Sequence, residues 1–385
     1  ARIITTVSGP EKAQLAAAAG ADEIINYKTQ DVVAEVHKVA PHGVDAIVEV
    51  SVARNASVDA QVLGMHGSVG IYAGDGGDTV TIPIRPMMGP NARWQFILVY
   101  TEPNDAKGAG IEDVNAVGNG VDPAVLGQRV WLWEAAQGRP WGTAAEYSVV
   151  PQRQAVLLPA NASFDLGACL GVPFLTAHRC LTVGEAMPDR LDPGALAGKT
   201  VLVQGGAGGV GNAAIQLARW ADARIITTVS SPEKAQLAAA AGADEIINYR
   251  TQDVVAEVRK VAPHGVDAIV EVSVARNASV DAEVLGLHGV VGIYADDGGD
   301  TVTIPIRAMM VPNARWQFVL VYTEPNDAKG AAIEDINAAV ADGAVRVGRE
   351  AGLPLHPFPL AETAKAHETL EGSPTGRVVV TVADL

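Results

Sequence analysis

The sequence contains few cysteines, no cluster of basic residues and no long apolar run. Its 385 residues include 2 cysteines, Cys169 and Cys180, too few for the four thiols of a zinc ribbon. The two could form one disulfide, but reduced thiols in the core of a cytoplasmic protein are the favoured interpretation.

The charge of the chain restricts its partners. A formal net charge of −16 disfavours binding to nucleic acid phosphates and to anionic membranes. Charges and glycines interrupt every apolar stretch before membrane-spanning length, and the first residues resemble a strand and a helix rather than a signal peptide. We therefore expect a small-molecule partner, with neither nucleic acid nor membrane.

One passage of the sequence occurs twice. Residues 1–116, termed copy 1, match residues 223–338, termed copy 2, at a constant offset of 222 with 12 differences. A solenoid repeat is shorter and recurs at least three times, so this is a duplicated domain fragment. A partial gene duplication and an artificial joining of two sequences would both leave this pattern.

From Lys199 onward, short apolar strands alternate with amphipathic helices. This alternation predicts an α/β fold with a doubly wound parallel sheet. The predicted strands are 199–206, 223–230, 245–249, 266–272 and 290–295, and the predicted helices are 209–221, 231–243, 254–262 and 277–289.

Between Gly118 and Gly198 the pattern changes to short strands separated by Gly and Pro, which indicates a β-rich module. The predicted strands are 127–133, 143–151 and 155–159, followed by a helix over 164–183. The chain end, 359–382, is predicted to be a helix, a turn and a closing strand.

The strongest local motif is GGAGGVG, Gly205 to Gly211, between a predicted strand and a predicted helix. Gly206, Gly208 and Gly211 satisfy G-x-G-x-x-G in the context that makes the motif meaningful. The first glycine permits a tight turn, the second lets the backbone approach a pyrophosphate, and the third packs the helix on the strand. The motif therefore predicts a dinucleotide site.

The end of the second strand, TTVSSPEK, indicates which dinucleotide binds. An NAD site usually has an acidic residue here for the ribose 2′-hydroxyl, but no carboxylate precedes Glu233. Ser230, Ser231 and Lys234 instead offer two hydroxyls and a cation to a 2′-phosphate, and Tyr249 could add a donor. The cofactor predicted by these residues is NADP.

From Gly120 to the C-terminus the chain resembles the medium-chain dehydrogenase/reductase superfamily, and within it the zinc-free quinone oxidoreductases of the zeta-crystallin type. Roughly two thirds of the chain carries the resemblance. The matching segments are GVPFLTAHRCL, KTVLVQGGAGGVGNAAIQLAR, SSPEKAQLAAAAGADEIINY and AHETLEGSPTGRVVVTV.

The resemblance implies a GroES-like β domain beside a Rossmann domain, with NADPH in the cleft and a quinone or related enone as substrate. It also implies a homodimer through the edge strand of the Rossmann sheet, no metal, and no assignable catalytic side chain. The cofactor contacts that it implies, in addition to the 2′-phosphate residues, are Gly208, Gly209, Val210, Thr176, Tyr294 and Arg377.

The sequence departs from the family pattern at two places. EVSV, Glu271 to Val274, lacks the glycine that often follows this strand, and the first half of the GroES-like domain is replaced by copy 1. The substrate pocket is therefore expected to be incomplete. The predicted divisions are 1–116, a partial Rossmann fragment; 117–198, the rest of the GroES-like domain; 199–345, the NADP-binding domain; and 346–385, the returning helix and strand.

Copy 1 lacks the first strand, the glycine turn and the first helix of the unit. It keeps Ser8, Lys12 and Tyr27 but has no pyrophosphate site, so we expect one NADPH per chain. We expect copy 1 to pack on the β module or to pair its segment 94–100 with 316–322.

Three functions fit these observations. The leading one is an oxidoreductase that transfers hydride from NADPH to a quinone or an α,β-unsaturated carbonyl. The alternatives are a non-catalytic NADPH-binding protein and a zinc-free alcohol or enone reductase. Five histidines without metal spacing are expected at the surface or at helix ends: His178, His264, His288, His356 and His367.

Overall fold

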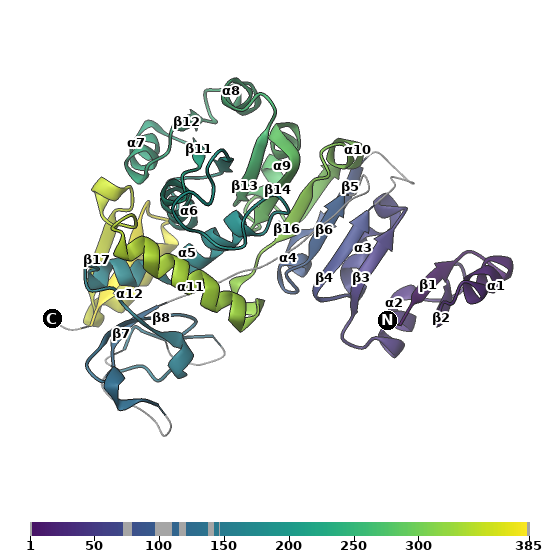
Figure 1. Ribbon diagram of the computed structural model, residues 1–385, viewed down its shortest axis with the longest axis horizontal. Coiled ribbons are helices and arrows are strands. Elements are labelled where there is room, and N and C mark those ends of the chain that lie inside the picture. Colours follow the sequence, from purple (N-terminus) through teal and green to yellow (C-terminus); the bar gives the residue numbers. More distant parts are fainter. Residues whose placement is uncertain are drawn as a thin grey trace.

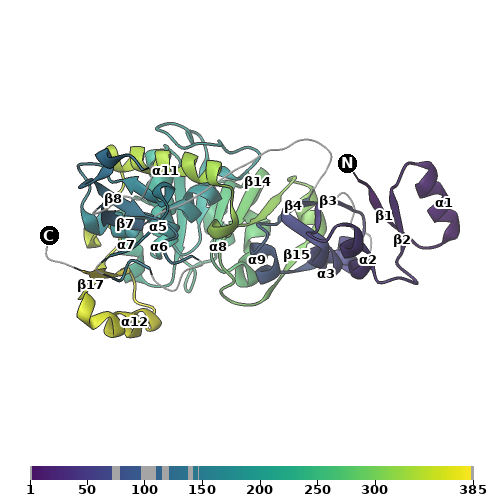
Figure 2. The ribbon, with the colours of Figure 1, turned by 90° about the horizontal axis from the view of Figure 1, so that it is seen from below.

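A computed structural model describes residues 2–71, 79–96, 110–114, 121–137, 142–145 and 147–382. The described residues of copy 1 up to Phe96 lie at one end of an elongated molecule, and the C-terminal strands lie at the other (Figures 1 and 2). Residues 110–113, which also belong to copy 1, lie instead in a sheet with later residues of the chain. Among the described residues, no helix is both long and apolar enough to cross a membrane.

Copy 2 and the strand before it form the predicted doubly wound parallel sheet, in the order β12-β11-β10-β13-β14-β16. The central strand β13 is buried along nearly its whole length, as expected when helices cover both faces. The strands are β10 (Thr200–Val203), β11 (Arg224–Val229), β12 (Glu245–Asn248), β13 (Val266–Glu271), β14 (Leu285–Ile293) and β16 (Arg315–Phe318). The helices are α6 (Gly209–Trp220), α7 (Pro232–Ala241), α8 (Val254–Val261) and α9 (Val274–Val284).

One helix differs from the prediction at both ends, since α9 begins at Val274 rather than at Asn277 and also ends early. The helix expected over 277–289 is α9, which ends at Val284, and β14 follows directly. His288 has a φ of 59°, which is incompatible with a right-handed helix. A Cβ atom at Gly286 would lie 3.1 Å from the carbonyl oxygen of Val266, so this glycine permits close packing of β14 on β13.

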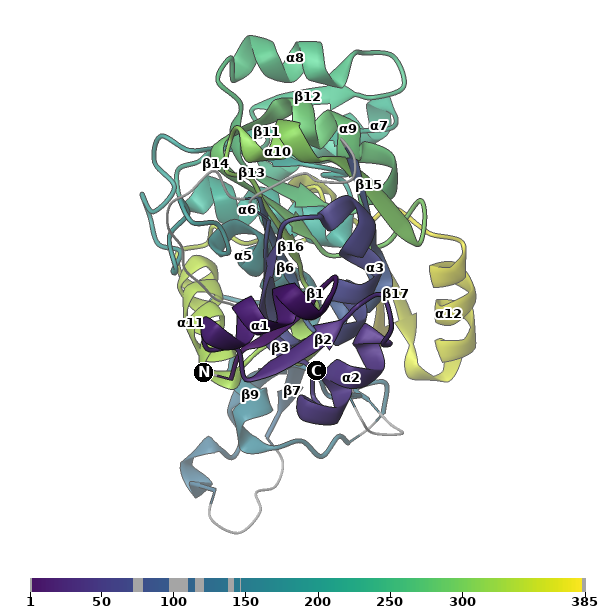
Figure 3. The same cartoon turned by 90° about the vertical axis from the view of Figure 1, so that its right-hand side faces the viewer.

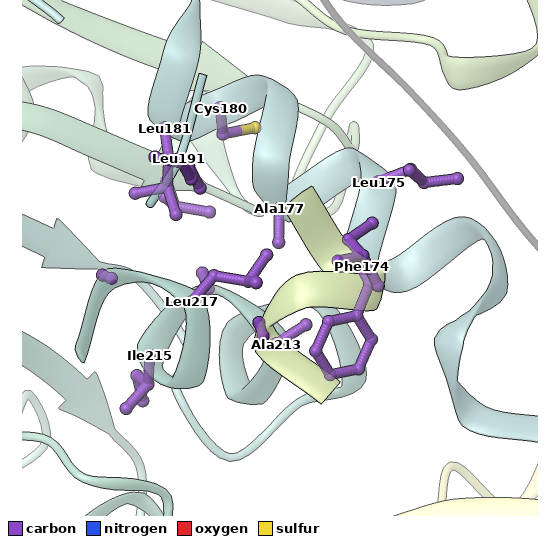
Figure 4. Close-up of a cluster of buried hydrophobic side chains, with 14 of the residues drawn as sticks. Phe174, Leu175, Ala177, Cys180, Leu181, Leu191, Ala213, Ile215 and Leu217 are labelled. Carbon is purple, nitrogen blue, oxygen red and sulfur yellow. The ribbon is translucent and has the colours of Figure 1, made fainter. Parts of the chain in front are cut away.

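The main hydrophobic core lies between α6 and the long helix α5 (Phe164–Thr182), whose apolar side chains face each other (Figure 4). The backbone of α5 leaves helical geometry at Gly171, just before Pro173, whose ring removes a donor from the helix. Buried side chains labelled in Figure 4 are Phe174, Leu175, Ala177, Cys180, Leu181, Leu191, Ala213, Ile215 and Leu217.

Copy 1 extends the large sheet to nine strands. The added strands are β6 (Arg93–Phe96), β4 (Leu63–Ile71) and β3 (Val44–Glu49), with β3 outermost. β6 lies beside β16 (Figure 1) and pairs with it antiparallel, with Trp94 opposite Trp316 in the register. The predicted pairing of 94–100 with 316–322 is confirmed at Trp94 and Trp316, and residues 97–100 lie outside the described part of the chain.

A second pair of strands strengthens this junction. β5 (Thr79–Pro83) pairs antiparallel with β15 (Thr301–Pro305), and the hydroxyls of Thr81 and Thr303 lie 3.1 Å apart. At both pairings a residue of copy 1 faces its own equivalent in copy 2, which is the pattern of a two-fold, isologous interface. The edge through which the sequence predicts a homodimer is therefore paired within one chain. The short helices α4 (Ile84–Met88) and α10 (Ile306–Met310) follow the two strands.

The first part of copy 1 stands apart from the large sheet. β1 (Ile4–Val7) and β2 (Glu23–Asn26) form their own two-stranded parallel sheet, at the end of the molecule seen in Figure 3. β10, which precedes copy 2 in the chain, joins β11 to β13. Among the described residues no strand joins β1 to β3 in this way, and the sheet of copy 1 is divided at this position. The helices of copy 1 are α1 (Pro10–Ala18), α2 (Val32–Val39) and α3 (Val52–Val62).

The β-rich module is smaller than predicted. It is a three-stranded sheet in the order β7-β8-β9, with β7 (Gly110–Asp113), β8 (Arg129–Leu132) and β9 (Ala155–Leu157). The described residues of the segment 143–151, which was predicted to be a strand, lie in no strand, and Tyr147 and Val149 are exposed.

The C-terminal segment contains one strand that was not predicted. β17 (Leu355–Pro359) pairs in parallel with β18 (Arg377–Thr381), and α12 (Thr363–Glu371) connects them. Two prolines in β17 hid the strand from the sequence pattern, because proline is confined to strand edges. The helix α11 (Asn326–Ala341) packs against α5.

Candidate cofactor site

The glycine turn joins β10 to α6 and depends on close backbone contacts. Gly205 has a φ of +73°, and its carbonyl oxygen accepts a 2.9 Å hydrogen bond from the Gly208 amide. A Cβ atom at Gly206 would lie 2.1 Å from the Thr227 hydroxyl, and one at Gly211 would lie 2.4 Å from the Gly205 oxygen. The left-handed residue of the turn is thus Gly205, one position before the motif glycine expected to have this role.

Arg377, at the start of β18, lies over the beginning of α6. A Cβ atom at Gly209 would be 3.5 Å from its Nη1 atom, so the guanidinium contacts the glycine turn directly. Its buried Nε has no hydrogen-bond partner among the described residues. Burial raises the pKa of the Cys169 thiol to about 11, and the nearby Arg377 charge opposes that rise. A guanidinium whose buried Nε lacks a hydrogen-bond partner, beside a helix N-terminus, fits a phosphate group.

The 2′-phosphate candidates meet at the ends of β11 and β12. Val229 and Asn248 are paired residues of these strands, so Ser230 and Tyr249, which follow them, are neighbours. The Tyr249 amide donates to the Val229 oxygen at 3.1 Å. The structure thus brings Ser230 and Tyr249 together at the adjacent ends of β11 and β12.

Ser231 has a structural role in that cluster. Its hydroxyl accepts a 3.3 Å hydrogen bond from the Lys234 amide and caps α7. The cap fixes the first turn of the helix, on which the half-buried Lys234 side chain stands. Ser231 thus positions Lys234 in addition to offering its own hydroxyl.

Thr176 and Tyr294 come from elements that contact each other. Thr176 is buried in α5, which packs against β13 and β14, and Tyr294 follows β14. The Tyr294 amide donates to the Glu271 carbonyl oxygen at 3.1 Å. Burial raises the pKa of the Tyr294 phenol well above its usual value, so it remains protonated at neutral pH.

A layer of buried polar side chains under the glycine turn was not predicted. The Gly205 amide donates to the Thr228 hydroxyl at 3.3 Å, and this hydroxyl donates to Gln204 at 2.6 Å. Gln204 in turn donates to Asp281 at 3.1 Å. Burial raises the pKa of the adjacent Glu271 carboxyl to about 7 and that of Asp281 well above its usual value. The available sequence signal for this layer was that Glu271 and Asp281 stand among apolar residues.

The histidine prediction is wrong at one position. His178 is fully buried in α5 and its Nε2 lies 2.8 Å from the Asp335 carboxylate, with Arg190 on the same carboxylate at 2.8 Å. Burial lowers the pKa of His178. Across the described ranges, no group of three or more His, Cys, Asp or Glu side chains could hold a metal ion. Cys169 and Cys180 are free and buried, as predicted.

Comparison with known proteins identifies relatives of both copies. The family model described as zinc-binding dehydrogenase matches residues 1–113 and 209–338. It therefore covers most of copy 1 and most of residues 199–345, the part of the chain that contains the glycine turn. The chain is 31% identical to the quinone oxidoreductase of Lama guanicoe over 291 residues, which is 74% of this chain and 80% of that protein. It is 29% identical to the human quinone oxidoreductase over 292 residues, with the same shares of each chain, 74% and 80%.

A solved structure supports the same assignment. A mycobacterial protein complexed with NADPH matches with a TM-score of 0.57 and 26% identity, over 71% of this chain and 81% of that chain. This structure and the 31% identical quinone oxidoreductase of Lama guanicoe together show the family of the chain. The chain belongs to the medium-chain dehydrogenase/reductase superfamily and, within it, to the quinone oxidoreductase family.

Proposed function

We propose that the protein is an NADPH-dependent oxidoreductase that reduces a quinone or a related α,β-unsaturated carbonyl compound. The observation that carries the proposal is the turn of Gly205 to Gly211 at the N-terminus of α6, with the unpartnered Nε of Arg377 beside it. NADPH supplies a hydride when bound, and a quinone needs little acid–base help because water can provide the proton.

We propose that backbone amides and side chains contact different parts of the cofactor. The amides of Gly206, Gly208, Gly209, Val210 and Gly211 would face the pyrophosphate, and Arg377 would add a charge. Ser230, Ser231, Lys234 and Tyr249 would hold the 2′-phosphate, where a charge-assisted bond contributes about 1.5–3 kcal/mol. Thr176 and Tyr294 would lie near the nicotinamide.

The domain division and the oligomeric state are part of the proposal. We divide the chain into 1–116, 117–198, 199–345 and 346–385, with one NADPH bound in the third part. A homodimer through the edge of the Rossmann sheet requires β6 and β16 to exchange partners between chains, because they pair within the chain. The proposal also includes metal independence, and the reduced thiols of Cys169 and Cys180 favour a cytoplasmic setting.

A non-catalytic NADPH-binding protein is the second candidate. It is favoured by the exposure of Tyr147 and Val149 in the β module, which is smaller than predicted. NADPH oxidation with 1,4-benzoquinone or 9,10-phenanthrenequinone separates the two. Steady turnover without added metal, together with one NADPH per chain by calorimetry, supports the enzyme. NADPH binding without turnover supports the second candidate, and absence of binding contradicts both.

A further inference from the structure

Glu271, the last residue of β13, lies at the base of the glycine turn and is 0% exposed. The Gln204 amide donates to the Val270 carbonyl oxygen at 3.0 Å, so Gln204 and Glu271 stand level at the ends of the neighbouring strands β10 and β13. A Cβ atom at Gly205 would lie 3.3 Å from the side chain of Val272. The residues on both sides of Glu271 therefore contact the segment that leads into the turn.

A directed chain of hydrogen bonds runs from the turn to a second buried acid. The Gly205 amide donates to the Thr228 hydroxyl, and this hydroxyl donates to Gln204. Gln204 then donates to Oδ1 of Asp281. The other oxygen of Asp281, Oδ2, is buried and has no hydrogen-bond partner among the described residues. Because a buried charge without a partner is costly, a neutral carboxyl fits this position better than a carboxylate.

Glu271 is the acid of this layer that ionises near neutral pH. Its Oε1 accepts a 3.1 Å hydrogen bond from Asn277, and burial raises its pKa to about 7. The titratable groups on the elements packed around this layer are Asp281 of α9, Cys180 of α5 and Tyr294 after β14. Burial raises the pKa of all three well above their usual values, and the charge of Glu271 raises that of Asp281 further. These three groups therefore stay protonated when Glu271 loses its proton.

We infer that Glu271 links the binding of NADPH at the glycine turn to the uptake of a proton, an inference that rests on the proposed function. The phosphates of NADPH bring negative charge to the turn. A carboxylate buried at its base repels this charge, and the repulsion is strong where water is excluded. A proton taken from solvent onto a Glu271 oxygen removes the repulsion, so the cofactor-bound chain holds this proton more tightly than the free chain. NADPH affinity therefore falls as the pH rises through about 7.

Calorimetric titration with NADPH across this pH range tests the inference. For the wild type we expect the dissociation constant to rise about five- to ten-fold between about pH 6 and about pH 8.5. Glu271→Gln keeps the shape of the side chain without its charge, so its dissociation constant should not follow this rise. The 2′-phosphate of NADPH ionises near pH 6, but the ligand is the same for every variant and its contribution cancels in the comparison.

The matched control is Glu49→Gln in copy 1. Glu49 ends β3 and accepts a 3.1 Å hydrogen bond from Asn55, as Glu271 does from Asn277. β3 is the outermost strand of the large sheet, on the far side of β16 from β10 (Figure 1). The Glu49→Gln chain should therefore keep the pH dependence of the wild type.

The proton itself can be counted. Titration at about pH 7.5 in two buffers of different ionisation enthalpy gives the protons taken up per NADPH bound, and this uptake should be smaller in Glu271→Gln than in the wild type. In the wild type, an infrared difference spectrum should show a protonated carboxyl that appears on binding, a readout that remains decisive if Glu271→Gln does not fold.

The outcomes separate this inference from the proposed function. NADPH binding by the wild type without pH dependence, or with a dependence that Glu271→Gln retains in full, overturns the inference and leaves the proposed function standing. Absence of NADPH binding by the wild type contradicts the proposed function and the inference together.

Discussion

Copies 1 and 2 have nearly the same sequence but different environments. Leu237 in α7 is 3% exposed, packed near α6 and the C-terminal segment, whereas its equivalent Leu15 in α1 is 71% exposed. The local structure is nevertheless shared. Asp31 and Asp253 both cap their helices by accepting a 3.1 Å hydrogen bond from the amide three residues later. The comparison shows that short-range interactions define most of the elements, whereas burial depends on the neighbours supplied by other parts of the chain. An exception is Gly110–Asp113, which forms β7, although the equivalent residues 332–335 lie in α11.

The largest expected difference concerns an acidic residue on the central strand. Val270→Asp places an unpaired charge in a closed core and should destabilise copy 2 by about 4 kcal/mol or more. Val48→Asp makes the same change on an exposed surface and should stay within about 0.5 kcal/mol. Urea unfolding of both variants measures the difference. Equal losses would mean that copy 1 is covered in solution.

The next prediction concerns a feature that the copies share. Burial, with a further contribution from Glu49, raises the pKa of Asp59 to about 8, and burial raises that of Asp281 in the same direction. Each carboxyl titrates near 3.8 when unfolded, so the folded chain binds the proton more tightly and loses stability as pH rises above about 4.

Asp59→Asn and Asp281→Asn should therefore gain stability over the wild type as pH rises from about 4 to about 8. The slope should reach at most about 1.4 kcal/mol per pH unit for each site. Thermal unfolding across this range measures it, and a difference that is flat with pH for either variant would contradict the raised pKa at that site.

The third prediction compares how substitution of the equivalent lysines in the two copies changes the affinity for NADPH. Lys234→Ala should weaken NADPH binding by about one to two decades, because a charge-assisted contact to the 2′-phosphate is lost. Lys12→Ala changes the equivalent lysine of copy 1, which has no glycine turn beside it, and should leave affinity unchanged. NADH affinity should be unaffected in both variants, as calorimetric titration can show. A loss with Lys12→Ala would place a cofactor on copy 1.

The smallest effect concerns a helix cap that differs between the copies. Ser231 caps α7, whereas Gly9 at the same position of α1 makes no side-chain cap. Ser231→Ala should cost about 1 kcal/mol, and Gly9→Ser should stabilise copy 1 by a few tenths of a kcal/mol. Chemical unfolding measures both changes. A loss of stability in Gly9→Ser would show that α1 begins differently from α7.

Much of the structure of residues 199–345, which contain the glycine turn, could be predicted from the sequence, because the sequence patterns that specify it are local. The alternation of strands and helices, the spacing of Gly206, Gly208 and Gly211, and the cluster of Ser230 with Tyr249 all depend on residues near one another in the chain or at the ends of adjacent strands. The buried layer of Gln204 and Asp281 could not be predicted in this way, because it joins residues 77 positions apart.

The sequence by itself determined most of the element types, the family and the presence of two copies of one fragment. Only the tertiary structure decided that Val270 is core while Val48 is surface, that His178 is buried against Asp335, and that segment 143–151 forms no strand in its described part. The physical reason is that turns, caps and hydrophobic periodicity act over a few residues, whereas burial and strand pairing require a partner. Copy 1 has the same local signals as copy 2, but no described strand joins β1 to β3 as β10 joins β11 to β13, and its sheet is divided.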